Sequence, residues 1–163
     1  MRIIPGWHPM IVHFPLALIV TAAMCLSLAR LRLALRYASV LATVGTWNLC
    51  VGAVAVYFAL GSGLAAVIGL HVGMAAHQAI TAHVKSAMLT AVLVTAAAVW
   101  RGAGAPQESR PTWVFLLLLW AATAAAVVTG YRGGQNVYRY GVGLDSGTTG
   151  SVETPAAASS KRP

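Results

Sequence analysis

Five histidines carry most of the chemistry that this sequence offers: His8, His13, His71, His77 and His83. His8 and His13 belong to a short stretch, residues 6–15 (GWHPMIVHFP), which also holds two prolines and two aromatic residues and leads into a long apolar run. An imidazole can bind a metal ion or a haem iron. A polar side chain at membrane depth is costly unless it has a partner. Residues 6–15, the N-terminal motif, therefore indicate where function is expected to lie.

The spacing of the histidines limits what they can bind together. Residues five apart on a helix are rotated by about 140°, so His8 and His13 cannot hold one ion from the same helical face. His71, His77 and His83 are six apart and would point about 120° from one another on one continuous helix. The spacing therefore argues against a cage of several histidines on one segment. For His8, His71 and His77, hydrogen bonding without a ligand is the simpler interpretation.

The composition places these histidines in a membrane protein. The chain has 163 residues, of which 58% are hydrophobic and 9% charged, whereas a soluble domain carries about 25% charged residues. The net charge of +8 comes from residues that flank apolar runs, as is usual beside membrane spans. We therefore expect a lipid bilayer around the chain, and no binding to nucleic acid.

Four apolar runs come close to the roughly 20 residues that a helix needs to cross a bilayer: residues 10–29, 37–60, 83–100 and 112–130. They predict an all-α fold, an integral membrane four-helix bundle. Gly45 and Gly52 in the second run would permit close helix approach. The intervening residues 64–82 are expected to form an interfacial helix or a loop. Residues 1–144 form the predicted transmembrane domain, and residues 145–163 a disordered tail.

Arginine density predicts the orientation of the bundle. Arg30, Arg32 and Arg36 crowd the first connection, and the positive-inside rule places that connection in the cytoplasm. With four spans, both termini then face outward. All five histidines gather at that outer end, together with residues 130–143 (GYRGGQNVYRYGVG), the C-terminal motif. This convergence does not depend on which side is the outer one.

Depth in the bundle selects two of the histidines. His13 lies about one turn into the first run and His83 opens the third, and first and third helices are diagonal neighbours in an up-and-down bundle. One imidazole from each helix at similar depth is the arrangement that axial ligation of a haem requires. We therefore predict that His13 and His83 bind haem b or a metal ion. Structural hydrogen bonding of both side chains remains an open alternative.

The C-terminal motif offers groups that could surround a cofactor without binding its metal. Its glycines would allow tight backbone folding over a cofactor or headgroup, and Arg132 and Arg139 could pair with carboxylates such as haem propionates. With His8, these arginines complete the predicted cofactor-binding set. The open alternative is that tyrosines and arginines anchor the chain at lipid headgroups. The sequence contains no Ser-His-Asp set, no paired carboxylates and no phosphate loop, so it does not decide whether the protein is an enzyme.

Both motifs resemble one bacterial membrane-protein family. The stretches GWHPMIVHFPLAL at residues 6–18 and GYRGGQNVYRYGVG at residues 130–143 are similar to the two ends of the family called domain of unknown function 2231, over residues 5–144. His83 looks like the histidine that commonly opens the family's third span, and Gln135 stands where relatives often carry an acidic residue. Family members are sometimes fused to Rieske iron–sulfur or c-type cytochrome domains. The resemblance thus implies redox partners.

These observations lead to one functional prediction and two alternatives. The prediction is a haem b electron-transfer subunit in the bacterial cytoplasmic (inner) membrane, multi-pass, that works with a separate Rieske or cytochrome c type partner. One alternative is a membrane scaffold or assembly partner without a cofactor. The other is a copper or zinc site formed by the histidines, since imidazole suits both metals.

Overall fold

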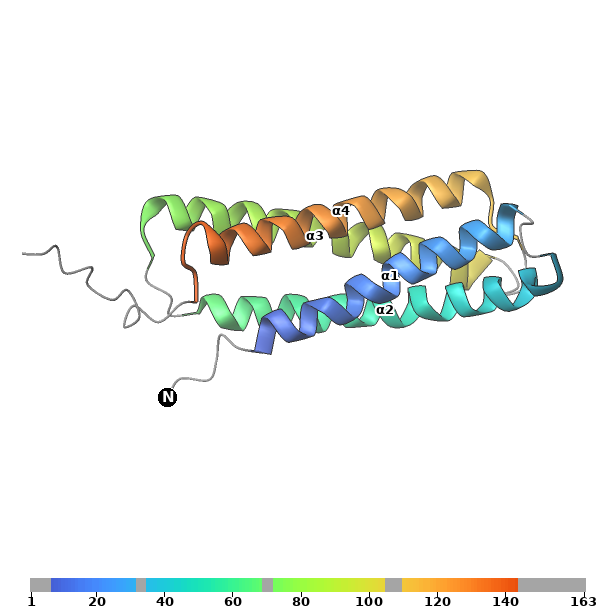
Figure 1. The fold of residues 1–163 in the computed structure, drawn as a ribbon, viewed down its shortest axis with the longest axis horizontal. Helices are drawn as coiled ribbons and strands as arrows, with labels where there is room; N and C mark the ends of the chain where they lie inside the picture. The colour runs from blue at the N-terminus through green and yellow to red at the C-terminus, as the bar shows by residue number, and fades with distance from the viewer. Residues whose placement is uncertain (1–6, 32–34, 69–71, 105–109, 144–163) are drawn as a thin grey trace, which may run out of the picture.

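The computed structural model describes residues 7–31, 35–68, 72–104 and 110–143. Four long helices make up this part of the chain: α1 (Trp7–Leu31), α2 (Ala38–Val67), α3 (Met74–Gly104) and α4 (Trp113–Tyr138), with a short 3₁₀ helix, η2 (Leu35–Tyr37), ahead of α2. Their order is up-and-down, and they form the predicted four-helix bundle (Figure 1). His71 and residues 145–163 lie outside the described residues.

Each of the four helices is long and apolar enough to cross a membrane. Between 22% and 33% of the most apolar stretch of each helix is buried inside the protein, so most apolar side chains point outward. Helices suit that setting because all their backbone hydrogen bonds are made within the segment. The protein is therefore an integral membrane protein with four spans.

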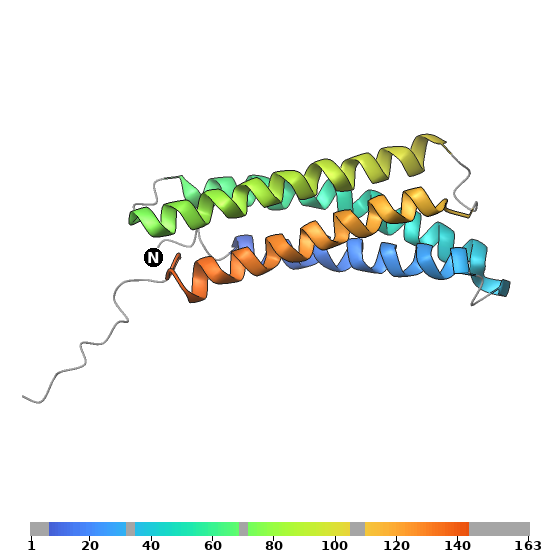
Figure 2. The same ribbon diagram turned by 90° about the horizontal axis from the view of Figure 1, so that it is seen from above.

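Close helix packing depends on small residues. α1 packs most extensively on α2, and α3 on α4, while α1 and α3 lie diagonally across the bundle (Figures 1 and 2). A Cβ on Gly45 would lie 2.7 Å from Leu26 Cγ, and one on Gly52 would lie 3.3 Å from Leu18 Cβ. The prediction that these two glycines permit close approach is confirmed.

The middle of the bundle is filled by apolar side chains. Ile19, Leu26, Leu49, Val94 and Leu119 come from all four helices and are at most 1% exposed. The one buried cation among the described residues is Arg101, whose Nε donates to Thr46 Oγ1 at 3.0 Å near the end where α3 stops. Chemistry at the two ends is thus separated by an apolar core.

The two largest differences from the predicted helix ends are at the start of α3 and at the end of α4. α3 begins at Met74, so residues 74–82 continue the third span instead of forming an interfacial segment. α4 continues to Tyr138, and Gly133 and Gly134 are helical instead of forming a tight fold of the backbone. Positive φ occurs only later in the described motif, at Gly141 (64°) and Gly143 (86°). The helices extend beyond the apolar runs, because helix hydrogen bonding continues through less apolar residues such as Gln78 in α3 and Gln135 in α4.

Candidate functional site

The histidine end of the bundle is the end where α1 and α3 begin and α2 and α4 stop, at the left in Figure 1. The other end, which carries Arg30, Arg36, Arg101 and Arg110, is called the arginine end below. The N-terminal and C-terminal motifs share the histidine end, as predicted. α1 and α4 approach each other there, since a Cβ on Gly130 would lie 4.0 Å from Leu16 Cδ2.

Two imidazoles from diagonal helices lie side by side at the histidine end. His8 is on the first turn of α1 and His83 is in α3, and their ring centroids are 6.4 Å apart with an interplanar angle of 80°. Both side chains are partly buried. His13 lies on another face of α1, where it is exposed and its Nδ1 bonds to the carbonyl of Pro9 on the same helix. The structure therefore brings His8, and not His13, next to His83.

Each ring of this histidine pair is fixed by a hydrogen bond to a neighbouring helix. His8 Nδ1 lies 2.9 Å from Ser62 Oγ on α2, and His83 Nδ1 lies 3.1 Å from the Thr129 carbonyl on α4. The Ser62 hydroxyl already donates to the Ala59 carbonyl at 2.9 Å, so it can only accept from His8. A carbonyl can only accept as well. Both neutral rings therefore carry their proton on Nδ1.

The consequence is that both Nε2 atoms keep an unshared electron pair. No hydrogen bond to either Nε2 is present within the described part of the chain. An imidazole nitrogen with an unshared pair can accept a hydrogen bond or bind a metal ion, so each Nε2 is available to a proton donor, a water molecule or a metal ion. An Nδ1–H bond to an oxygen acceptor is also the arrangement that commonly orients a metal-ligating histidine.

Two helical glycines make room for the rings. A Cβ on Gly63 of α2 would lie 2.8 Å from His8 Cε1, and a Cβ on Gly133 of α4 would lie 3.2 Å from His83 Cε1. Any side chain at Gly63 would displace the His8 ring, while a Cβ at Gly133 would require the His83 ring to shift by a few tenths of an ångström. All four helices thus contribute to the site, through His8, Gly63 with Ser62, His83, and Gly133 with Thr129.

Polar side chains continue from the pair into α3 and α4. Ser86 Oγ donates to the His83 carbonyl at 2.8 Å, and Thr90 Oγ1 lies 3.0 Å from Thr129 Oγ1. Asn136, one turn beyond Gly133 on α4, is 7% exposed, and its Oδ1 is buried without a hydrogen-bond partner among the described residues. An unpaired buried amide oxygen is unusual and is often found where a site takes a ligand or water.

The two predicted arginines differ in their positions. Arg132 Nη1 donates to the carbonyl of Ala82 at 3.1 Å. Ala82 directly precedes His83, so this hydrogen bond connects α4 to α3 next to the histidine pair. Arg139 follows α4, is exposed, and places its guanidinium 5.8 Å from the ring centroid of Tyr140.

His77 is exposed on α3 and lines a surface cavity of about 350 Å³ with Thr81, Lys85 and Val67.

Sequence reasoning missed Ser62, Gly63 and Thr129. None of these residues belongs to a predicted site, and Ser62 and Gly63 lie beyond the second predicted span, which ends at residue 60, whereas residues 61–63 are a regular part of α2. Small and hydroxyl residues at one end of a membrane helix could have signalled a partner for a nearby histidine.

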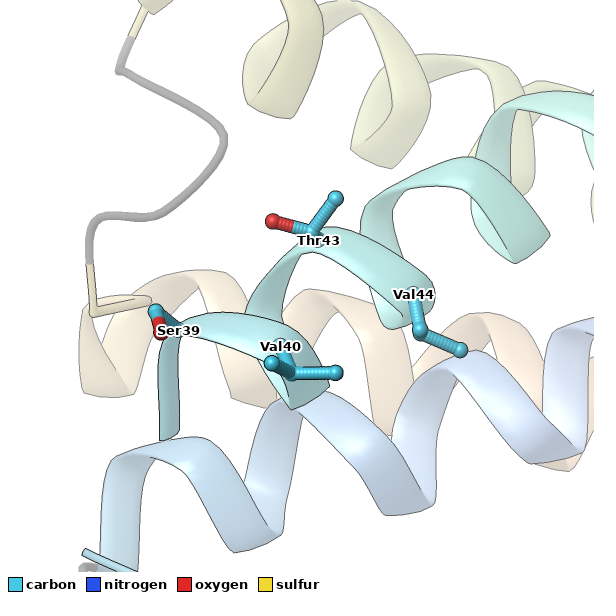
Figure 3. A pocket seen from close by; sticks show the side chains of 4 residues that line it. All are labelled: Ser39, Val40, Thr43 and Val44. Carbon is cyan, nitrogen blue, oxygen red and sulfur yellow. The ribbon is translucent and has the colours of Figure 1, made fainter. Parts of the chain in front are cut away.

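A second surface hollow, of about 200 Å³, lies against Ser39, Val40, Thr43 and Val44 at the start of α2 (Figure 3). Those residues carry no titratable group and lie at the arginine end.

The donor set of the histidine pair restricts what it can hold. Within the described residues, no group of three or more His, Cys, Asp or Glu side chains could hold a metal ion. A structural zinc site needs four ligands, whereas a haem iron takes four nitrogens from its porphyrin and needs only axial ligands from the protein. Two metal–imidazole bonds of about 2 Å in line, with half a ring on either side, place two centroids about 6 Å apart. The observed separation of the two centroids, 6.4 Å, is close to that value.

Comparison with known proteins agrees with the membrane fold and identifies the family. No curated protein and no solved structure matches the chain. The family described as "Predicted membrane protein (DUF2231)" matches residues 5–146, which include both motifs, all four helices and the histidine pair. The chain belongs to this family of predicted membrane proteins.

Proposed function

We propose that the protein is the membrane subunit of an electron-transfer system and binds one haem b through His8 and His83. The observation that carries the proposal is the histidine pair: two imidazoles from diagonal helices with ring centroids 6.4 Å apart, both Nδ1 atoms hydrogen-bonded, and neither Nε2 bonded to any of the described residues. In this proposal His8 takes the role that the sequence predicted for His13. When bound, the haem would supply one-electron oxidation and reduction.

The chain's own residues would hold and orient that group. Ser62 and Thr129 fix the rings, and Gly63 and Gly133 let the rings lie close to the helix backbones. Arg132 lies beside His83 and could offer its guanidinium to a carboxylate of the cofactor. Arg139 is farther along the chain at the same end and is available to a carboxylate of a partner.

The position of the site favours electron exchange at one membrane surface. The core between the two ends is apolar, and all five histidines of the chain lie toward the histidine end or in the connection there. A second bis-histidine centre at the arginine end would lack ligands. A separate redox protein, such as a Rieske or cytochrome c type partner, would therefore dock at the histidine end, which the positive-inside rule places outside the cytoplasm.

A visible spectrum of the detergent-purified protein from haem-replete cells tests the proposal. We expect a Soret band and a low-spin spectrum that changes on reduction. His8→Ala and His83→Ala should each abolish the low-spin spectrum, whereas His77→Ala, an exposed histidine on α3, should leave it intact. His13→Ala separates the two ligand assignments, because loss of the spectrum in that variant would restore His13 as a ligand.

A single copper ion is the second candidate. Both rings are packed directly against helix backbones at Gly63 and Gly133, and such close packing suits a small ion better than a macrocycle. Elemental analysis would then find about one copper per chain, lost in His8→Ala and His83→Ala, with no Soret band. A colourless protein without bound metal, in which both substitutions only lower expression or stability, would favour the scaffold alternative.

A further inference from the structure

The arginine end contains a cation that the histidine site does not use. Arg30 is in the last turn of α1, and its guanidinium carbon lies 5.0 Å from the ring centroid of Trp113, the first residue of α4. Its Nε atom is buried and has no hydrogen-bond partner among the described residues. A buried donor on a charged group is costly to leave unpaired. Within the described residues, Nε of Arg30 thus lacks an acceptor, and the positive charge of the guanidinium has no acidic side chain as its partner.

Acidic side chains are scarce in this protein. The chain has three Asp and Glu residues in all, and they stand at positions 108, 145 and 153, outside the described residues. Arg110, three residues before Trp113, is exposed and adds a second positive charge near the start of α4. Glu108 stands two residues before Arg110 in the sequence and lies outside the described residues, so the described charges at the junction of α1 and α4 are positive. A guanidinium suits a phosphate because it can donate two parallel hydrogen bonds.

The seam between α1 and α4 below this cation is apolar on its outer side. Trp120 Nε1 donates to Ser27 Oγ at 3.1 Å across the seam. Arg30 and Trp113 lie on the same helical faces as Ser27 and Trp120, because they are three and seven residues away. Met24, Leu31 and Leu117 share those faces and are 54%, 50% and 72% exposed. A cation above an apolar seam matches a phospholipid, whose phosphate would meet Arg30 while its acyl chains lie along the seam.

We propose that Arg30 and Trp113 form a binding site for the phosphate group of an anionic phospholipid at the junction of α1 and α4. Trp113 is 56% exposed and anchors this junction at the headgroup level, where tryptophan is enriched. Its ring holds the guanidinium in place through a cation–π contact. The site is independent of the histidine pair, which lies at the opposite end of the bundle.

Native mass spectrometry of the detergent-purified protein tests the site. The probes are phosphatidylglycerol, phosphatidylcholine and inorganic phosphate, titrated separately. We expect phosphatidylglycerol to bind more tightly than phosphatidylcholine, and Arg30→Gln to weaken its affinity about tenfold, the loss expected for one charge-assisted hydrogen bond. Arg36→Gln is the matched control, because Arg36 is exposed at the same end with its guanidinium over Tyr37, and it should change the affinity less than twofold.

The outcomes separate specific binding from general attraction. Equal losses in Arg30→Gln and Arg36→Gln would overturn the proposal in favour of non-specific charge. Binding of inorganic phosphate as tight as that of phosphatidylglycerol, and equally dependent on Arg30, would replace the lipid by a soluble anion and so overturn the lipid assignment. If Arg30→Gln does not fold, Arg30→Lys is the second variant, because it retains the charge without the planar guanidinium group that donates two parallel hydrogen bonds. It should show an intermediate loss, and wild-type affinity in that variant would contradict a guanidinium–phosphate contact.

Discussion

At the scale of single residues, the hydrogen bonds of the two imidazoles determine what they can do. Ser62 and the Thr129 carbonyl accept from Nδ1, so the proton is placed on one nitrogen and the electron pair on the other. With the opposite tautomer, Nε2 would carry the proton and could not bind a metal ion. The sequence alone could not reveal this, because neither Ser62 nor Thr129 is near a histidine in the chain. Their role appears only when α2 and α4 are packed beside α1 and α3.

Gly63→Ala is predicted to disturb the site through one methyl group. The new Cβ would lie 2.8 Å from His8 Cε1, a distance that real side chains do not tolerate, so the ring must leave its position beside Ser62. If the histidine pair holds a cofactor, we expect cofactor content in the purified protein to fall at least tenfold, with a smaller effect on the melting temperature in detergent, because the displaced atoms are at the end of a side chain that can rotate away. Gly61→Ala is the control, since nothing lies within 4 Å of a Cβ there. Equal cofactor content in the two variants would show that the His8 position is unimportant.

At the scale of elements, hydropathy predicted the number and order of the helices but not all their ends. The first span extends at both ends, from the predicted residues 10–29 to Trp7–Leu31, and the third begins nine residues earlier than predicted, at Met74. Hydropathy detects the part of a helix that lies in lipid, whereas helix hydrogen bonds continue wherever residues of adequate helix propensity follow.

The inward face of α1 was equally hard to predict. Residues around His13 are apolar on every side, so periodicity did not show that His8 would face the bundle.

The contact between α1 and α2 depends on Gly45. A Cβ at this position would lie 2.7 Å from Leu26 Cγ and 3.1 Å from Cys25 Cβ, and Leu26 is completely buried. Gly45→Ala should therefore push α1 and α2 apart and destabilise the bundle by about 1–3 kcal/mol. Gly61→Ala, on the same helix but in open space, should be neutral or stabilising by up to about 1 kcal/mol, because alanine is the better helix former. Thermal melts of both variants in one detergent would measure the difference, and a Gly45→Ala variant as stable as the wild type would contradict this packing.

At the scale of the whole molecule, the two ends of the bundle are chemically distinct. The histidine end carries the histidine pair and the C-terminal motif, and the arginine end carries a buried arginine, a half-buried arginine and two exposed ones. The sequence predicted this division because four spans place alternate connections on opposite sides. It could not predict that His8 pairs with His83 or that Arg30 stacks on Trp113, since both contacts depend on how the α1–α2 and α3–α4 hairpins pack together.

The orientation of this asymmetric bundle in the membrane is the remaining prediction at this scale. Three arginines, Arg30, Arg32 and Arg36, occur within seven residues of the first connection, and arginine-rich short connections stay in the cytoplasm during insertion. Reporter domains fused after Arg36 and after Arg139 should therefore report opposite sides, with the first in the cytoplasm. Replacing the three arginines by glutamine is expected to weaken this preference, so that a fraction of the fusions reverses, while the exposed Arg139→Gln should have no such effect. A reporter after Arg36 found outside in the wild-type chain would reverse the assignment and place the histidine pair at the cytoplasmic surface, where its electron partner would have to be a cytoplasmic protein.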